Sequence, residues 1–301
     1  MDLQPVETHL VYGFLDAGKT TYIQDCIFHD YYHKYGTTLI LALESGETEY
    51  DETALLDYKT HVAYREGSGD DLAAFCLAQL DRFRPGRVYV EMNLMVPDLR
   101  AQLPPRLHVA SAAALVDFAT LGPYLNNLRT QFSEMVRNCQ TVTFRNCPSR
   151  EALAPYSQTF RLLNRKAAYL RQDAMGYHER AFDLFVPYDL TADTLTIGRD
   201  AYLAFFLDGC EHPEHYGGKT LRFTLPLQVR EGTAGLTVMT CCMADIQFMG
   251  FPLTGGGAEG WVSLTARGAV AAGEYGVRRL TLEVLALSTA KPPQELILKA
   301  I

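Results

Sequence analysis

The sequence lacks several features that would place it in a specialised class of protein. No apolar run approaches the roughly 18 residues of a membrane-spanning helix; the best candidate, 107–116, contains a histidine and a serine. The 27 Lys and Arg residues are outnumbered by 35 Asp and Glu and form no stripe, which disfavours nucleic-acid binding. The N-terminus has no basic segment followed by an apolar one, so we expect a cytoplasmic protein.

A disulfide framework is also missing. The chain has seven cysteines, an odd number, and no export signal, so free thiols are expected and metal binding is the alternative. The remaining composition, 48% hydrophobic and 21% charged, is that of a globular protein, and 301 residues suit two domains.

Apolar runs alternate with longer amphipathic stretches over the first 180 residues. Five runs are typical of buried strands, namely His9–Tyr12, Thr38–Leu43, Val88–Val90, Ala110–Val116 and Thr141–Phe144. Four stretches predict helices, namely Thr20–His33, Asp70–Phe83, Pro123–Asn138 and Arg150–Ala168. The alternation predicts an α/β domain over 1–180, with a parallel sheet covered by helices on both faces.

After residue 180 the pattern changes to short β-prone runs interrupted by glycine. These runs are 221–227, 236–242, 261–266 and 280–287, with one helical patch at 201–207. They predict a second domain over 181–301, a small and mostly antiparallel β-barrel of the OB-like kind.

A phosphate-binding pattern follows the first expected strand. Residues 13–20, GFLDAGKT, match G-x-x-x-x-G-K-[ST] in full and open an expected helix. The glycines let backbone N–H groups face phosphate oxygens, and the helix adds the positive end of its dipole. We therefore expect a P-loop that binds a nucleoside triphosphate, with Lys19 at the β- and γ-phosphates and the Thr20 hydroxyl on Mg²⁺. The predicted nucleotide-binding residues are Gly13, Asp16, Ala17, Gly18, Lys19, Thr20 and Thr21.

Acidic side chains follow two of the expected strands. Glu44 and Glu91 end the second and third strands, so both are expected in the crevice beside the P-loop. We predict catalytic roles for both, in holding Mg²⁺ (Glu44 together with Thr20), its waters or the attacking water. The alternative is that they simply meet solvent. The Asp16 carboxylate would repel phosphate and is expected to point to solvent.

A second Gly-Lys-Thr occurs at 218–220. Five residues before its glycine stands Pro213 instead of a second glycine, and no strong strand precedes it. We therefore do not expect a phosphate site there.

Several segments resemble one protein family. Residues 13–21, GFLDAGKTT, resemble the loop of the CobW family of P-loop GTPases, which commonly reads GFLGAGKTT. Residues 44–52 resemble the switch segment of a two-domain CobW-like subgroup. Residues 124–129 and 239–251 resemble other segments of the same subgroup, and 239–251 are similar to part of YcgQ-type C-terminal domains. The resemblance implies a GTP- or ATP-binding hydrolase with Mg²⁺, a metallochaperone role with Zn²⁺ or cobalt, and a metalloprotein client or a permease as partner.

Three positions depart from that family. Of its Cys-x-Cys-Cys metal motif, expected between the two glutamates, only Cys76 is present. Leu94 replaces the glycine of a Glu-x-x-Gly element at 91–94, and Pro148 replaces the guanine-reading aspartate at 145–148. We expect phosphate binding to persist, with weak selectivity between GTP and ATP and slow hydrolysis.

Two groups of metal-ligating residues occur in the second half. Cys241 and Cys242, together with Asp245, would bind zinc if the chain turns or bulges there. In a regular strand the two side chains would point to opposite faces, and the alternative is that they are buried thiols in the wall of the barrel. Cys210, His212 and His215 form a second compact set that could complete a zinc site with those two thiols, and the alternative is a surface turn at Pro213.

Three functions stay open at this point. The first is a CobW-like accessory protein, a slow Mg²⁺-dependent NTPase linked to metal delivery. The second is a degenerate P-loop protein that binds nucleotide without useful turnover and regulates a partner, such as a permease. A small-metabolite kinase is the third, disfavoured because no Arg-rich insertion follows the third strand.

Overall fold

The computed structural model describes residues 4–29, 36–44, 46–65, 71–173, 175–182, 186–240, 246–272 and 278–299. Its contacts divide the chain into two compact units. The first unit comprises Met1–Ala154 and Lys166–Phe182, and the second comprises Pro155–Arg165 and Asp183–Ile301. The two units are described separately below.

The first unit is built on a sheet that, within the described residues, has eight strands in the order β3-β2-β4-β1-β5-β6-β7-β8. These are β1 (Val6–Gly13), β2 (Thr38–Ala42), β3 (Thr60–Tyr64), β4 (Arg87–Glu91), β5 (Leu107–Asp117), β6 (Thr141–Arg145), β7 (Ala168–Gln172) and β8 (His178–Arg180). All neighbouring strands are parallel except β7 and β8. The P-loop follows β1, which lies inside the sheet between β4 and β5.

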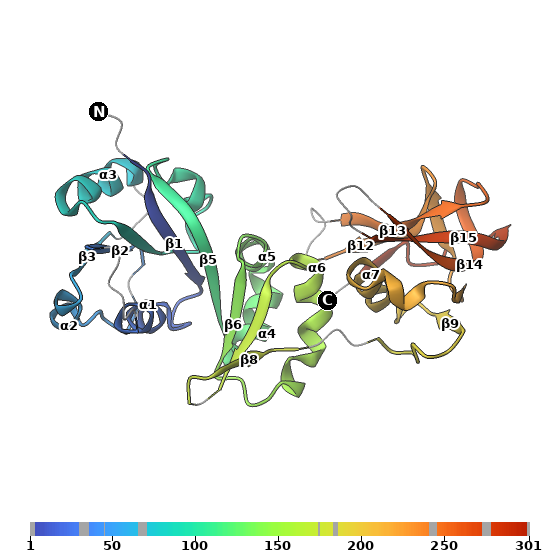
Figure 1. Cartoon of the computed structure of the whole chain (residues 1–301), viewed down its shortest axis with the longest axis horizontal. Helices are drawn as coiled ribbons and strands as arrows, with labels where there is room; N and C mark the ends of the chain where they lie inside the picture. Colours follow the sequence, from blue (N-terminus) through green and yellow to red (C-terminus); the bar gives the residue numbers. More distant parts are fainter. Residues whose placement is uncertain are drawn as a thin grey trace. The chain divides into compact units, whose positions relative to one another are not determined.

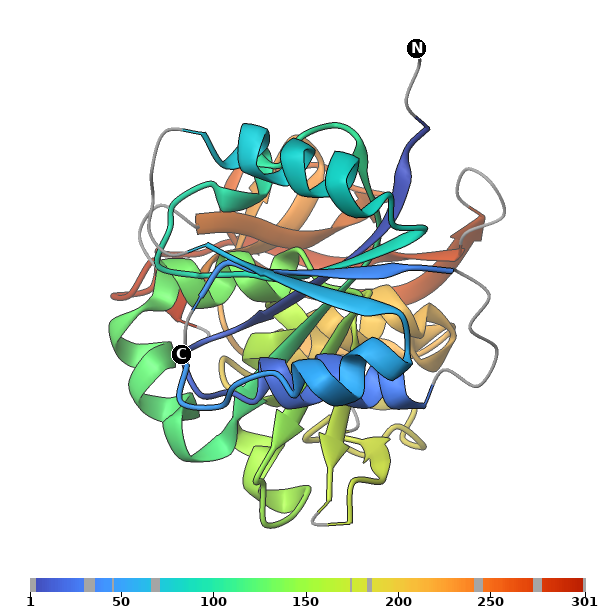
Figure 2. The same ribbon diagram turned by 90° about the vertical axis from the view of Figure 1, so that its left-hand side faces the viewer.

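Helices cover both faces of this sheet. Figure 2 shows α1 (Lys19–Phe28) and α2 (Glu52–Asp57) on one face and α3 (Leu72–Phe83) on the other. Every residue of β2 and β4 is buried, as in strands that are covered on both sides. The predicted α/β sheet with helices on both faces is confirmed. The chain also forms η1 (Leu99–Gln102), α4 (Phe118–Asn127), α5 (Arg129–Arg137) and η2 (Glu151–Tyr156).

The elements of residues 1–182 differ from the prediction in two ways. The short elements β3 and α2 had no clear signal in the sequence. The stretch 150–168 is not one helix, because it contains Pro155, which lacks an N–H group for a helical hydrogen bond. It forms η2 and then α6 (Ser157–Leu163), which belongs to the second unit, and β7 of the first unit begins at Ala168.

The second unit contains a closed ring of strands. Its strands are β9 (Thr194–Ile197), β10 (Thr220–Phe223), β11 (Leu227–Arg230), β12 (Thr233–Met239), β13 (Ile246–Thr254), β14 (Gly260–Ala272), β15 (Arg278–Thr289) and β16 (Ile297–Lys299). The ring runs β11-β12-β13-β15-β14 and returns to β11, and only β13 and β15 pair in parallel within it. The predicted barrel of mostly antiparallel strands is confirmed. The run 221–227 is two strands, divided before Leu227 by Pro226.

The helix α7 (Tyr202–Glu211) packs against β15 (Figure 1). Its residue Phe205 lies at the centre of the aromatic part of the core. The ring of Phe205 makes edge contacts with those of Tyr216, Phe223 and Phe251, at centroid distances of 5.1, 5.5 and 5.2 Å. The short helix η3 (Pro213–Tyr216) follows α7. Across the described ranges of the chain, no helix combines the length and the apolar character needed to cross a membrane.

Two glycines that face each other on β12 and β13 generate a prediction for this barrel. A Cβ atom added to Gly235 would lie 2.2 Å from the carbonyl oxygen of Met249, and the partner of Gly235 in the strand register is Gly250. We expect Gly235→Ala to destabilise the unit by about 1–3 kcal/mol through overpacking. Denaturant unfolding followed by Trp261 fluorescence measures this, since Trp261 lies in β14 and is the only tryptophan.

Gly257→Ala is the control, because its added Cβ would meet no atom within 4 Å. An unfolding midpoint for Gly235→Ala as high as that of Gly257→Ala would contradict the close approach of these two strands.

Candidate functional site

The P-loop turns between β1 and α1 through a glycine that cannot be replaced without strain. Gly18 has a φ of 86°, in the left-handed region that favours glycine. A Cβ at this position would also lie 1.5 Å from Nη1 of Arg145, a side chain at the end of β6. The backbone conformation therefore requires glycine here, and a side chain at this position would also displace the guanidinium of Arg145.

The ammonium group of Lys19 lies inside this loop. The residue is only 3% exposed, and its Nζ donates to the carbonyl oxygens of Gly13 and Phe14 at 3.0 Å each. Nζ also forms an ion pair with Glu44, whose side chain is 10% exposed. Because the pair is largely withdrawn from water, salt screens it little. The structure thus brings together the predicted phosphate-binding lysine and the predicted carboxylate at the end of β2.

Glu91 is the second buried carboxylate of the site, at 5% exposure. Its Oε1 accepts a hydrogen bond from the Thr20 hydroxyl at 3.3 Å, and its Oε2 accepts one from the Tyr50 hydroxyl at 2.5 Å. Burial raises the pKa of Glu91 above its usual value, and these hydrogen bonds and the nearby Lys19 offset this only in part. The structure therefore places Glu91 beside Thr20, as expected, while its catalytic role stays a prediction.

A cavity of about 430 Å³ opens beside these groups, and we call it the P-loop cavity. Its lining residues are Thr20, Glu44, Gly46, Thr48, Glu49, Tyr50, Glu52, Tyr64 and Glu91. A smaller cavity of about 110 Å³ shares five of them and extends to the P-loop at Leu15, Asp16, Gly18 and Lys19. Four of the lining residues of the larger cavity are glutamates, so it repels a phosphate that arrives without a cation.

The donor groups of this cavity fit a magnesium ion. The hydroxyl of Thr20 and the carboxylates of Glu44 and Glu91 are hard oxygen ligands, the kind that Mg²⁺ prefers. Burial raises the pKa of Glu91, so a cation bound beside it would favour its carboxylate form. Asp16, also predicted near the nucleotide, is exposed, in accord with the expectation that it points to solvent; its Oδ1 is 3.5 Å from the backbone nitrogen of Glu47.

The phosphate-binding pattern does not include two residues that hold the site together. One is Tyr50, which bonds Glu91 from the segment before α2. The other is Arg145, whose Nη1 donates to the carbonyl oxygen of Gly18 at 3.0 Å and whose Nε donates to Gln172 at 2.9 Å. Arg145 ends a parallel strand, as Glu91 does, and this position is the one signal that would have indicated it.

The predicted cysteine sites have different outcomes. Cys241, Cys242 and Asp245 lie outside the described residues. Burial of Cys76 in α3 raises its thiol pKa to about 11, so it is a protonated core residue near neutral pH. Cys210 is not part of the metal-ligating group that the structure forms in its neighbourhood, which consists of His212, Glu214 and His215.

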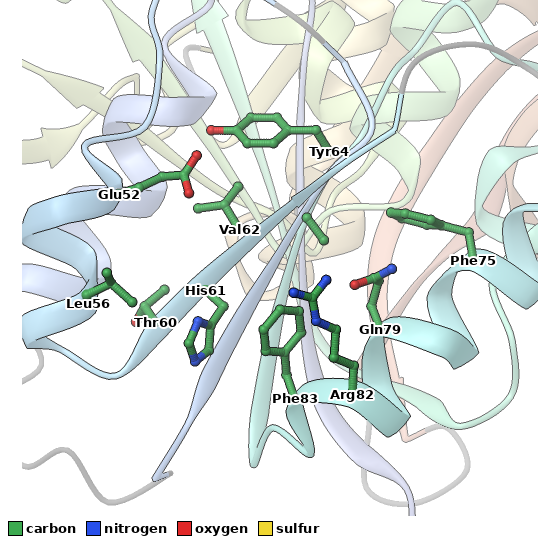
Figure 3. A pocket seen from close by; sticks show the side chains of 11 residues that line it. Glu52, Leu56, Thr60, His61, Val62, Tyr64, Phe75, Gln79, Arg82 and Phe83 are labelled. Atoms are coloured by element: carbon green, nitrogen blue, oxygen red, sulfur yellow. The ribbon is translucent and has the colours of Figure 1, made fainter.

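A second pocket, of about 440 Å³, lies along the edge strand β3 and also borders on Glu52 and Tyr64 (Figure 3). Here the ring of His61 stacks on that of Phe83 at 4.5 Å, and the guanidinium of Arg82 lies 4.7 Å from the same ring. These side chains pack on an aromatic ring instead of converging on one point, as Lys19, Thr20 and the two carboxylates do. We therefore place the candidate site at the P-loop cavity.

Known proteins resemble the chain in structure. The Zn(II)-bound triple mutant of the YjiA GTPase is 20% identical, with 60% of this chain and 64% of that chain covered and a TM-score of 0.42. The Zn(II)-bound YjiA GTPase from E. coli is also 20% identical, with 60% of this chain and 61% of that chain covered and a TM-score of 0.40. The hydrogenase maturation factor HypB from Archaeoglobus fulgidus is 16% identical, with 57% of this chain and 82% of that chain covered and a TM-score of 0.40. The chain thus spans less than two thirds of the YjiA structures. No protein-family profile and no curated protein matches it.

The buried carboxylate of Glu91 leads to a prediction for stability against pH. Because its folded-state pKa is raised above the ordinary value of about 4.3, the folded state binds the proton more tightly, and its stability falls as pH rises through this window. Glu91→Gln removes the charge and keeps an oxygen for the Tyr50 hydroxyl. We expect this variant to melt above the wild type at pH 7 without nucleotide and Mg²⁺, and the difference to shrink towards pH 4.

Glu259→Gln, a change at an exposed glutamate, is the control and should leave the melting temperature nearly unchanged. A Glu91→Gln variant that melts below the wild type at pH 7 would show that the carboxylate is stabilising and fully compensated.

Proposed function

We propose that this chain is a P-loop protein that binds Mg²⁺ with GTP or ATP and hydrolyses the triphosphate slowly. The observation that carries the proposal is the pairing of Lys19 with Glu44 at the P-loop, next to the hydrogen bond between Thr20 and Glu91. A cation and a hydroxyl of the P-loop stand at the base of an acidic cavity. Triphosphate and a divalent cation together match this distribution of charge, whereas either alone does not.

The chain's own residues suggest a role for each group. The ammonium of Lys19 would exchange the carbonyl oxygens of Gly13 and Phe14 for oxygens of the β- and γ-phosphates. Thr20 and Glu44 would hold Mg²⁺, which when bound neutralises charge on the phosphates. Glu91, kept in place by the Tyr50 hydroxyl, would orient a water molecule. The oxygen of that water would bond to the γ-phosphorus as the bond from the γ-phosphorus to the bridging oxygen breaks. The nucleoside diphosphate would leave, and the proton of the water would pass to an oxygen of the phosphate that forms.

The contacts of Arg145, an arginine beside the P-loop, support slow turnover. Nη1 of Arg145 donates to the carbonyl of Gly18 and its Nε donates to Gln172, so its guanidinium fixes the shape of the P-loop. In this proposal Arg145 is a positioning residue and does not stabilise the charge of the transition state, as an arginine does in fast P-loop hydrolases.

We further propose that the two compact units are the domains expected over 1–180 and 181–301. The ring of five strands supports an OB-like classification of the second domain. The resemblance of residues 13–21 to CobW-family loops supports a link between the nucleotide and delivery of a metal such as zinc to a partner, either a metalloprotein client or a permease. A cytoplasmic location would suit such a role.

Lys19→Ala tests the phosphate site. We expect the affinity for Mg²⁺·GTP to fall at least tenfold, about 1.4 kcal/mol, because the charge that meets the phosphates is lost. Isothermal titration of the folded variant measures this, with thermal unfolding in parallel, since Glu44 loses its partner. Lys219→Ala is the control: this lysine stands in the second Gly-Lys-Thr, and its Nζ donates to the Ala192 carbonyl. Equal affinities of the two variants would remove the P-loop from the proposal.

Base selectivity gives a second test. Pro148 stands where a carboxylate would accept hydrogen bonds from guanine, and each such charge-assisted bond is worth roughly 1.5–3 kcal/mol. We expect a preference for GTP over ATP of less than about a hundredfold, or 2.7 kcal/mol. Competition between the two nucleotides at a constant Mg²⁺ concentration measures the ratio. A preference of several thousandfold would mean that another residue reads the base.

A further inference from the structure

Metal-ligating side chains gather in the second unit, at the end of α7. His212 follows this helix, and Glu214 and His215 lie in η3. One ligand atom from each residue lies within 4.8 Å of those of the other two. The rings of His212 and His215 stack with their centroids 5.0 Å apart. The two imidazoles and the carboxylate thus share one small region of the surface.

Local backbone structure produces this grouping. The backbone nitrogen of His215 donates to the carbonyl oxygen of His212 at 3.0 Å, which closes a 3-10 turn with Pro213 at its first position. In a 3-10 helix, residues three apart lie one above the other. The spacing of two residues between His212 and His215 therefore places both rings on the same side of the turn.

A buried carboxylate fixes one of the two histidines. Nδ1 of His215 lies 2.9 Å from Oδ2 of Asp208, which is only 3% exposed and also accepts from the hydroxyl of Tyr216 at 2.8 Å. The hydroxyl of Tyr188 lies 2.7 Å from that of Tyr216 and extends the network. A carboxylate at this distance favours the tautomer with the proton on Nδ1, and that tautomer has its lone pair on Nε2. Metal-binding histidines are oriented by carboxylates in this way.

We propose that His212, Glu214 and His215 bind a divalent transition-metal ion of the zinc type, through two imidazole nitrogens and one carboxylate oxygen. Nitrogen and oxygen ligands of this kind suit Zn²⁺, Co²⁺ and Ni²⁺ but not Mg²⁺. Three protein ligands leave the fourth position of a tetrahedral ion open to water or to a ligand from a partner. Asp208 is the positioning residue of the site.

The side chains are suited to close around an ion. Bonds of about 2.0–2.2 Å bring ligand atoms to roughly 3.4 Å from one another, less than the 4.8 Å within which they lie. His212 and Glu214 are about half exposed, at 50% and 51%, so both are free to rotate by the small amount required, while His215 is held by Asp208. Their exposure also allows the ion to enter and leave the site without any change at the P-loop.

The thiol of Cys210, which the sequence placed in this set, has a different environment. Its charged neighbours are Arg165 and Glu211. Glu214 takes its place among the ligand groups. The site therefore has no thiolate ligand, and this sets it apart spectroscopically from any site formed by Cys241 and Cys242.

Co²⁺ titration of the metal-free full-length chain tests the site, with excess Mg²⁺ present to occupy carboxylate sites. We expect one equivalent of Co²⁺ to bind with visible d–d bands and without a thiolate-to-metal charge-transfer band, and Zn²⁺ to displace it. His212→Gln/His215→Gln should weaken Co²⁺ binding at least about a hundredfold. The control His108→Gln/His178→Gln removes two exposed histidines elsewhere and should bind like the wild type.

Asp208→Asn tests the positioning role. We expect the affinity of the folded variant for Co²⁺ to fall about tenfold, whereas a merely structural role would change unfolding, followed by Trp261 fluorescence, and leave the affinity unaltered. If this variant does not fold, the histidine variants decide. The proposal would be overturned if His212→Gln/His215→Gln bound Co²⁺ as tightly as the wild type. It would also be overturned if the wild type showed a thiolate-to-metal charge-transfer band, and if Cys241→Ser/Cys242→Ser lost both this band and all Co²⁺ binding.

Discussion

The buried ammonium of Lys19 is the interaction on which the candidate site depends. A charge that is 3% exposed is costly unless it is paired, and here Glu44 and two carbonyl oxygens of the P-loop supply the partners. Glu91 accepts hydrogen bonds from the hydroxyls of Thr20 and Tyr50, and its burial raises its pKa although these bonds and Lys19 lower it in part. One buried cation therefore faces two buried carboxylates. The site has a deficit of positive charge that a magnesium ion, arriving with a triphosphate, is suited to remove.

The topology of the sheet places these groups together. β2, β4 and β1 are neighbours and run parallel, so the residues that follow them meet at one edge. In the register of the sheet, Glu91 lies opposite Val11 of β1 and Ala42 of β2. Glu44 follows two residues beyond Ala42 and reaches the ammonium of Lys19. Each group is thus held by a buried strand, which gives the site a rigid frame on the side of the carboxylates.

Local patterns in the sequence were enough to predict the P-loop, the parallel sheet, the barrel and the positions of Glu44 and Glu91. They were not enough where distant segments meet. The hydrogen bond from Tyr50 to Glu91, the contact of Arg145 with Gly18 and the approach of Gly235 to Gly250 depend on strand order and register, which no local pattern contains. The histidine group at η3 was found in part, with Cys210 in the position that Glu214 occupies, because the sequence spacing does not show which side chains the turn brings together.

A crystal structure of the chain with Mg²⁺ and a non-hydrolysable GTP analogue tests the central claim most directly. The claim is that Lys19 binds the phosphates of a triphosphate and that Thr20 binds its magnesium ion. The predicted result is that Nζ of Lys19 lies about 2.7–3.2 Å from oxygens of the β- and γ-phosphates, and that the Thr20 hydroxyl has exchanged Glu91 for the metal ion. A structure in which the nucleotide is bound elsewhere, and Lys19 keeps its contacts with Gly13, Phe14 and Glu44, would contradict the claim.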